Sequence, residues 1–307
     1  MAERLSGGGP PMTVLDEPGS AGAAARTVRR AGSGRPDRRP ALLLLPALIL
    51  LVAFFVYPLG TIAWHAFTDP SPGLKNFIWF FTTSTNLDIL TRTFTTGLWV
   101  TTTTLLLSYP YAYAMTVAGP RGRGVLTLLV LLPFWTSLMV RTFAWTILLQ
   151  DTGVISRLLG TIGIGPVHLI RTQTGVVIGM VQLLMPFMVL PLYSVMNGID
   201  RRLVLAARGL GARPASAFVR VYIPLSLPGV AAGCLMVFVS SLGFYITPAL
   251  LGSPENALIS QQIYVQVDGL LQWGHGGAMG VVLLGLTLAL LALAALTLRR
   301  TGKQVLS

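Results

Sequence analysis

Six long apolar runs constrain the fold of this chain more than any other feature. They cover residues 41–63, 95–118, 125–149, 174–196, 229–251 and 278–298, and Arg141 is the one charged residue among them. A helix needs about 20 apolar residues to cross the roughly 30 Å hydrocarbon core of a bilayer. A helix also satisfies its own backbone groups where no water is present. The sequence therefore predicts an all-α integral membrane protein with six transmembrane helices.

The charge content excludes a soluble enzyme of this size. Only 10% of the 307 residues are charged, against about 25% in an average soluble domain. Cys234 is the single cysteine and lies in an apolar run, and three histidines are scattered along the chain. We therefore expect neither a disulfide framework nor a metal site.

Charge between the runs is strongly asymmetric. The N-terminal tail, the 119–124 turn, the 197–223 loop and the C-terminal tail hold 17 of the 22 Lys and Arg residues but 5 of the 10 acidic ones, so they carry the whole net charge of +12. Segments rich in Lys and Arg stay on the cytoplasmic side of a membrane. We expect both termini and the 197–223 loop in the cytoplasm.

The same pattern divides the chain into parts. Residues 1–39 form a basic tail whose composition predicts disorder, and either Met1 or Met12 fits as the true start. Residues 40–300 form the six-helix domain, and residues 301–307 form a short cytoplasmic tail. Basic residues beside a membrane span contact anionic lipid headgroups, so we expect lipid contact and no nucleic-acid partner.

The 197–223 loop predicts two short amphipathic helices separated by a break. Gly211 suits the left-handed conformation that ends a helix, and Pro214 suits the first turn of the next one. Apolar positions follow helical spacing on both sides of this break: Leu203, Val204, Ala207 and Leu210 before it, and Phe218, Val221 and Tyr222 after it. Such a hairpin suits docking into a groove on a cytoplasmic partner.

The residues of this loop carry a resemblance to a known family. Leu205-Ala206-Ala207 is followed by three residues, Gly211, nine residues and Val221-Tyr222-Ile223-Pro224. This segment resembles the loop of Glu-Ala-Ala, three residues, Gly, nine residues and Ile-x-Leu-Pro in membrane subunits of binding-protein-dependent ABC importers. Leu205 stands where that pattern has Glu. The resemblance implies an ATPase-coupling loop made of Leu205, Ala206, Ala207, Gly211, Pro214, Phe218, Val221, Ile223 and Pro224.

Three further segments resemble the first membrane subunit of spermidine/putrescine-type permeases. They are Tyr109–Tyr113, Leu132–Trp145 and Leu242–Gly252. The resemblance implies the type I ABC importer permease fold in a bacterial cell membrane. It also implies a second permease subunit, two ATPase subunits and an extracytoplasmic solute-binding protein. Similar permeases move iron, thiamine-like or phosphonate-like solutes, so these alternatives to a polyamine cargo stay open, as does pairing with an identical or a related permease.

No part of the sequence predicts catalysis. The chain lacks a Gly-x-x-x-x-Gly-Lys-Ser/Thr loop, and it shows no Ser/His/Asp or paired-carboxylate constellation. We expect no cofactor in this chain, with ATP and Mg²⁺ bound by the partner ATPase. A stand-alone channel or a membrane enzyme is the alternative class, but neither explains a docking hairpin.

Candidate residues for the translocation pathway are Trp135, Arg141, Phe143, Trp145 and Tyr245. Aromatic faces attract cations, but aromatic residues at helical spacing also serve packing. Arg141 has two interpretations, because an intramembrane charge indicates function and a long basic side chain also reaches the headgroups from near a helix end. Since no Asp or Glu lies in any run, we expect a separate binding protein to select a cationic cargo.

Overall fold

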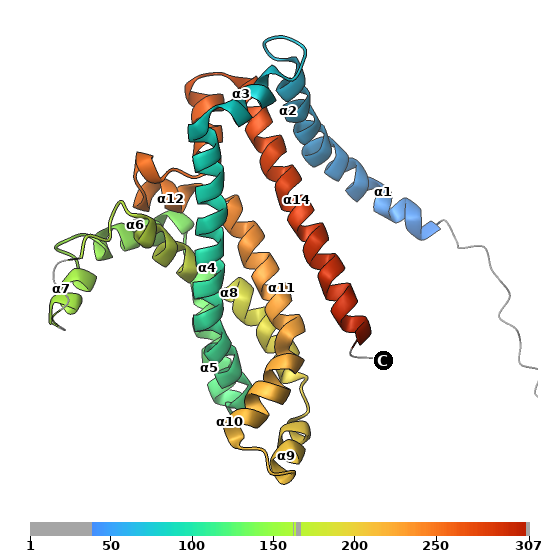
Figure 1. Ribbon diagram of the computed structural model, residues 1–307, viewed down its shortest axis with the longest axis vertical. Helices are drawn as coiled ribbons and strands as arrows, with labels where there is room; N and C mark the ends of the chain where they lie inside the picture. Colours follow the sequence, from blue (N-terminus) through green and yellow to red (C-terminus); the bar gives the residue numbers. More distant parts are fainter. Residues whose placement is uncertain (1–38, 162, 164–166, 305–307) are drawn as a thin grey trace, which may run out of the picture. The chain divides into compact units, whose positions relative to one another are not determined.

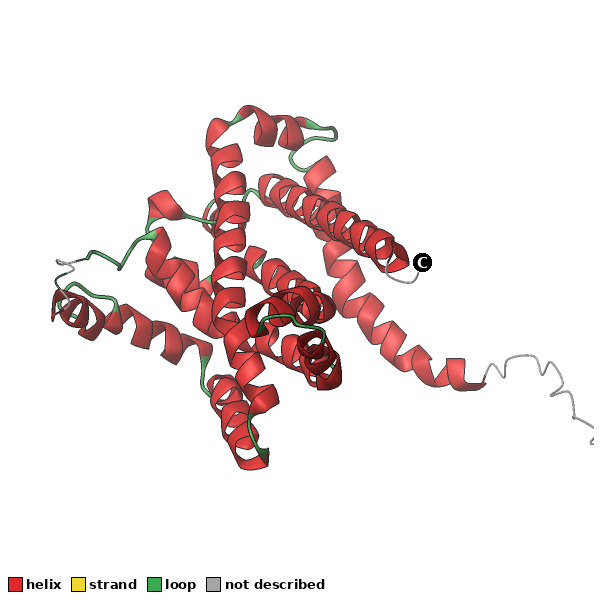
Figure 2. Ribbon diagram, turned by 60° about the horizontal axis from the view of Figure 1, so that its bottom comes forward, coloured by secondary structure: helices red, strands yellow, loops and turns green. Residues whose placement is uncertain are grey.

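The computed structural model describes residues 39–161, 163 and 167–304, and every regular element among them is helical (Figure 2). The chain divides into two units, residues 1–52 and 53–307. The described part of the first unit is α1 (Arg39–Leu51), which is apolar and contains Pro46. Residues 1–38 of the predicted basic tail and residues 305–307 lie outside the described part.

The second unit consists of helices and short helical turns in the order that Figure 1 shows. After the π-helical turn η1 (Val52–Val56), they are α2 (Tyr57–Thr68), α3 (Lys75–Thr82), α4 (Ser84–Val117), α5 (Pro120–Leu131), η2 (Leu132–Trp135), α6 (Leu138–Leu148), α7 (Val154–Thr161), α8 (Gln173–Asn197), α9 (Arg201–Gly209), α10 (Pro214–Ala217), η3 (Phe218–Tyr222), α11 (Ile223–Leu242), α12 (Ile246–Leu251), η4 (Pro254–Asn256), α13 (Ile259–Tyr264), η5 (Val265–Gly269) and α14 (Trp273–Gln304).

Helices α4, α8 and α11 pack against one another and form the core of this unit. Helix α8 supplies more of the buried apolar side chains than any other described helix, among them Met180, Leu184 and Met188, while Val100 comes from α4 and Val237 from α11. Helix α14 packs separately against α2, α3 and α13. The helices that pack together thus overlap the apolar runs in which the sequence predicts long helices.

Among the described residues, four helices are long and apolar enough to cross a membrane: Leu45–Thr68, α8, Pro214–Leu242 and Trp273–Leu296. A fifth candidate is the pair Pro120–Trp135 and Leu138–Leu148, which is bent by 99° at a short break. Helix α4 is not among these, although its 34 residues extend for about 50 Å. Length and composition therefore support four or five of the six predicted spans.

Helix α4 is less apolar than α8 and α11, because threonines line its buried side. The hydroxyl groups of Thr93, Thr101 and Thr104 donate to the carbonyl oxygens of Ile89, Gly97 and Val100, four residues earlier, at 2.8, 2.7 and 2.6 Å. A hydroxyl that bonds its own helix is satisfied without water. This pattern lets polar side chains occupy a core position.

The predicted span over residues 125–149 does not form one continuous helix. Helix α5 passes into the 3₁₀ turn η2, which contains Pro133, and residues Thr136 and Ser137 then have ψ values of 147° and 137° before α6 begins. Proline cannot donate a backbone hydrogen bond and clashes with the preceding turn. The chain therefore turns sharply where the apolar pattern alone suggests a straight rod.

The predicted helix over residues 229–251 also has other bounds. The continuous helix runs from Pro214 to Leu242 through α10, η3 and α11, and α12 is a separate short helix. Gly243 ends α11, and Pro248 lies in the first turn of α12, where proline is tolerated. Similarly, α4 begins at Ser84, well before the predicted start at residue 95.

Two glycines allow α8 and α11 to approach closely. A Cβ on Gly229 would lie 2.9 Å from the Cβ of Val195 and 3.1 Å from the carbonyl oxygen of Pro191. A Cβ on Gly233 would lie 2.6 Å from the Sδ of Met188. Small residues one helical turn apart permit such close packing between membrane helices.

Gly229→Ala is therefore expected to destabilise the core by about 1–3 kcal/mol, the usual cost of forcing extra atoms into a packed contact. Gly285→Ala on α14 is the matched control, because a Cβ there meets no heavy atom within 4 Å. Thermal unfolding of the purified chain in detergent measures the difference. Equal midpoints for the two variants would contradict the close α8–α11 contact.

Candidate functional sites

The two short helices predicted between residues 203 and 224 are present as α9 and α10. The carboxylate of Asp200 caps α9 by accepting a hydrogen bond from the amide of Arg202 at 2.9 Å. Gly211 follows the helix with a φ of +91°, and its amide donates to the carbonyl of Arg208 at 3.0 Å. Glycine adopts this left-handed conformation without a Cβ penalty. The predicted conformation of Gly211 is confirmed.

Pro214 begins α10, as predicted, and the helix then continues into α11. We call α9, the Gly211 turn, α10 and η3 together the hairpin. Its exposed apolar side chains are Leu203, Leu205, Leu210 and Val219, with 49, 60, 90 and 56% of their surface exposed. Of the other predicted coupling residues, Ala206 and Pro224 are exposed, whereas Ala207, Val221 and Ile223 are half-buried. An exposed apolar strip of this kind is typical of a surface that a partner covers.

An aromatic cluster joins the hairpin to the end of α4. The ring centroid of Tyr113 lies 5.4 Å from those of both Phe218 and Tyr222, edge-on in each case. Phe218 and Tyr222 stack on each other at 5.1 Å, and the guanidinium of Arg201 donates to the carbonyl of Thr116. These contacts connect the hairpin directly to the end of α4.

Four of the five predicted pathway residues lie on the bent helix pair. Trp135 is on η2 and is 86% exposed, while Arg141, Phe143 and Trp145 lie on α6. The indole Nε1 of Trp145 donates to Oε1 of Gln182 on α8 at 3.4 Å. Arg141 is half-buried, and its Nε is shielded without a hydrogen-bond partner in the described part of the chain.

Tyr245, the fifth predicted pathway residue, lies just before α12. Helix α12 packs beside α6, where the hydroxyl oxygens of Thr142 and Thr247 are 3.4 Å apart. Tyr245 itself lines a cavity that none of the other four residues lines. The structure therefore brings two elements of the predicted pathway side by side but does not gather its five residues in one site.

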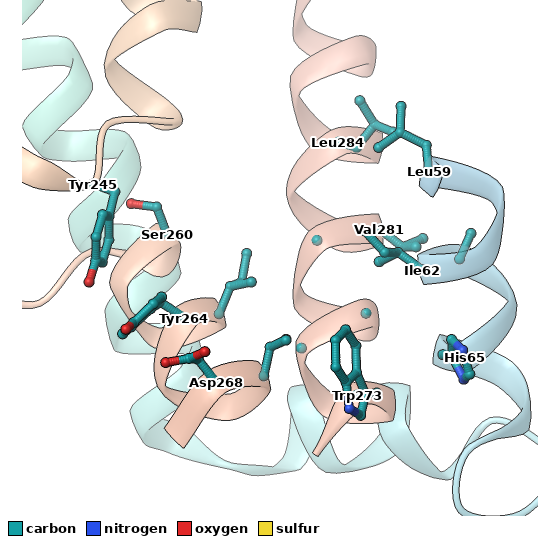
Figure 3. A pocket seen from close by; sticks show the side chains of 16 residues that line it. Leu59, Ile62, His65, Tyr245, Ser260, Tyr264, Asp268, Trp273, Val281 and Leu284 are labelled. Carbon is teal, nitrogen blue, oxygen red and sulfur yellow. The ribbon is translucent and has the colours of Figure 1, made fainter. Parts of the chain in front are cut away.

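That cavity has a volume of about 600 Å³ and lies between α2, α14 and the segment from Tyr245 to η5 (Figure 3). Most of its wall is apolar. Figure 3 shows the polar side chains of Tyr245, Ser260, Tyr264 and Asp268 following one another along one side, with His65 and Trp273 across the cavity. The cavity thus combines an apolar body with a polar edge.

Two tyrosines and a carboxylate form this polar edge. The ring centroids of Tyr245 and Tyr264 are 5.0 Å apart. The carboxylate of Asp268 beside the hydroxyl of Tyr264 raises the pKa of that phenol above its ordinary value. No basic side chain in the described residues pairs with Asp268. A carboxylate that lacks a basic partner and lies beside aromatic faces suits an ammonium group, through both charge and cation–π attraction.

Sequence reasoning missed Ser260, Tyr264, Asp268 and Trp273 as site residues. The spacing of Tyr264 and Asp268, four residues apart, was the available signal, because such residues share one face of a helix. Nothing in the sequence indicates that Trp273 and Tyr245 approach them from other elements. Within the described residues, no group of three His, Cys, Asp or Glu side chains could hold a metal ion.

Comparison with known proteins identifies the family. Residues 115–302 match the family described as "Binding-protein-dependent transport system inner membrane component". The chain belongs to this family. The spermidine/putrescine transport system permease protein PotB of Haemophilus influenzae is 38% identical over 201 residues, which cover 65% of this chain and 69% of that protein. The inner membrane ABC transporter permease protein YdcU of Escherichia coli is 30% identical over 248 residues, 73% of this chain and 79% of that protein.

A solved structure shares the fold. The permease aligns with a chain of a bacterial alginate ABC transporter, crystallised with an alginate pentasaccharide-bound periplasmic protein, at a TM-score of 0.68 and 20% identity. The alignment covers 86% of this permease and 95% of that chain. The predicted ABC permease fold is thereby confirmed at the level of the helical architecture.

Family membership shows which class of protein this chain is. The permease is a membrane component of a binding-protein-dependent ABC importer, and not its ATPase, a stand-alone channel or a membrane enzyme. Together with its apolar helices, the family makes it a multi-pass protein of the bacterial inner membrane. The matched region begins near the end of α4 and includes the hairpin and the polar edge of the cavity.

Proposed function

We propose that the permease pairs with a second permease subunit to form the pathway of an ATP-driven importer for a polyamine of the spermidine/putrescine class. The likeness to the PotB proteins carries this proposal. The cavity beside Tyr245 supports it, because Asp268 and two tyrosine rings offer charge and aromatic faces to a flexible polycation. A solute-binding protein delivers the cargo.

The proposed membrane arrangement has six passages with both termini in the cytoplasm. These passages are the helix Leu45–Thr68, α4, the bent pair α5 and α6, α8, the helix Pro214–Leu242, and α14. Helix α4 is included because its length suffices and its buried hydroxyls bond within the helix. The excess of Lys and Arg at the hairpin and termini supports the orientation.

Single cysteines test this orientation. In a chain with Cys234 replaced by serine, a cysteine at Ser84 is expected to react with an impermeant thiol reagent applied to intact cells. A cysteine at Leu210, the most exposed large apolar residue of the hairpin, is expected to react only after the membrane is opened and the ATPase stripped. Labelling of residue 210 in intact cells would reverse the proposed topology.

The hairpin is the proposed contact with the ATPase subunit. Its exposed leucines suit an apolar groove, and the surrounding arginines suit an acidic rim. When ATP closes the ATPase pair, the hairpins move, and the aromatic cluster carries this movement into α4. The pathway then alternates between inward-open and outward-open states whose populations the nucleotide shifts.

Uptake by whole cells tests the cargo. Deletion of this permease is expected to abolish binding-protein-dependent uptake of labelled spermidine or putrescine, and the gene on a plasmid is expected to restore it. Iron, thiamine and phosphonate uptake are measured in parallel. If the deletion removed uptake of one of these solutes and left polyamine uptake intact, the polyamine assignment would be wrong.

A further inference from the structure

A second cavity, of about 380 Å³, lies under the hairpin, where α9 and η3 meet the ends of α4 and α8. Its lining includes two arginines, Arg123 and Arg201, and no Asp or Glu. Leu205 of α9 and Tyr222 of η3 complete the wall nearest the hairpin. The cavity is therefore positively charged without an internal counterion.

Two shielded donors in this cavity lack acceptors. Nε of Arg123 is shielded from solvent and has no hydrogen-bond partner among the described residues. Tyr222 is 6% exposed, and its hydroxyl lies near Thr116 without any partner at normal hydrogen-bond geometry. Arg201 donates to the carbonyl of Thr116, which uses one of its five donors. Shielded donors without acceptors destabilise a folded chain, so a bound anion would be favoured here.

The start of α5 adds to the positive charge. Arg121 and Arg123 occupy its first turn, and the N-cap residue Gly119 offers no side-chain acceptor. The N-terminus of a helix carries a partial positive charge, which disfavours cations and favours anions. An anion beside Arg123 would relieve this repulsion.

We propose that this cavity binds the phosphate group of an anionic membrane lipid, held by Arg123, Arg201 and the hydroxyl of Tyr222. Apolar side chains mark where the acyl chains lie. Val117 lines the cavity and is 51% exposed, and Val125 and Leu128, which follow Arg123 on α5, are 57% and 60% exposed. Basic pockets between membrane helices on the cytoplasmic side bind such headgroups.

The site has a consequence for coupling. Because Leu205 and Tyr222 border both the cavity and the hairpin, a lipid in the cavity supports the hairpin from beneath. The position of the site in the cytoplasmic leaflet rests on the proposed topology. The positive charge and the hydrogen-bond donors of the cavity do not depend on that topology. Lipid binding and uptake are therefore measured separately.

Native mass spectrometry of the purified full-length chain tests the proposal after delipidation and re-addition of phosphatidylglycerol or phosphatidylcholine. The wild-type chain is expected to retain phosphatidylglycerol preferentially. The double variant Arg123→Gln and Arg201→Gln is expected to lose about tenfold or more in retention, because charge-assisted hydrogen bonds are removed. Arg121→Gln, on the same helical turn but outside the cavity lining, removes the same type of charge and is expected to retain the lipid.

Two outcomes of this experiment would overturn the proposal. Equal retention of the two lipids by the wild-type chain would exclude a specific site for the anionic headgroup. Displacement of phosphatidylglycerol by excess inorganic phosphate would identify a site for free phosphate instead of lipid. Polyamine uptake that stays intact after deletion of this permease would count against the proposed function and leave the lipid site standing.

A second variant avoids removing the arginines. Leu205→Glu introduces a carboxylate into the cavity lining, one helical turn from Arg201, and is expected to displace the lipid while retaining the fold. Leu203→Glu is its control, because Leu203 lies on the same helix and does not line the cavity. Tyr222→Phe keeps the ring packing and is expected to weaken retention a few-fold. Equal lipid retention by the two glutamate variants would contradict the site.

Discussion

Replacement of Gly211 by valine is expected to abolish ATP-driven uptake while the helix bundle stays folded. Gly211 has a φ of +91°, and a β-branched residue in this region costs about 1–3 kcal/mol of backbone strain. A Cβ at residue 211 would meet no heavy atom within 4 Å. The strain is therefore confined to the turn of the hairpin, where it changes the angle between α9 and α10 and misaligns the surface proposed to contact the ATPase.

Gly209→Val is the matched control for this experiment. Gly209 ends α9, lies two residues away, and also has open space around its Cβ position, but its φ is not in the left-handed region. Co-purification of the ATPase and uptake are measured for both variants. Wild-type behaviour of Gly211→Val would remove the hairpin as the coupling element, whereas equal loss in both variants would show that added bulk, and not backbone conformation, is responsible.

Asp268→Asn is expected to have the second-largest effect on uptake. It is expected to act on the contact with the cargo and not on the contact with the ATPase. The carboxylate lies on the polar edge of the larger cavity and has no basic partner in the described part of the chain. Loss of one charge-assisted contact to an ammonium group raises the half-saturating polyamine concentration by about tenfold. Initial uptake rates over a range of spermidine concentrations measure this change.

Asp88→Asn is the control for Asp268→Asn, because Asp88 is exposed on α4 and does not line the cavity. Tyr264→Phe keeps the aromatic face beside Tyr245 and is expected to change uptake little. Unchanged half-saturation in Asp268→Asn would show that the cargo does not contact this edge. The separate coupling test at Gly211 would remain informative in that case.

Apolar pattern and charge distribution predict the helices of this permease well where each run is uniform. Helix α8 runs from Gln173 to Asn197 and agrees within one residue with the run at 174–196. Prediction is poorer where prolines and glycines interrupt a run. Pro133 and Gly243 lie inside the apolar patterns, but whether the chain bends slightly or breaks completely there depends on the packing of α6 and α12 against each other.

The candidate sites also differ in how far the sequence predicts them. The hairpin is encoded locally, because Gly211 and Pro214 determine its turn from within a short segment. The larger cavity is not encoded locally, since Tyr245, Asp268 and Trp273 come from three elements that meet only in the folded chain. The smaller cavity likewise depends on α4, α5 and α9 meeting, and neither Arg123 nor Arg201 is distinctive in the sequence.

The break between η2 and α6 restricts what can surround that part of the permease. Helix α6 has 11 residues and extends for about 16 Å, too short to cross a hydrocarbon layer of roughly 30 Å by itself. In the proposed topology, Thr136 and Ser137 therefore lie at membrane depth with extended backbone. Acyl chains cannot hydrate exposed peptide groups. This segment must consequently be covered by protein or wetted by a water-filled vestibule, so lipid is excluded from one side of the third passage.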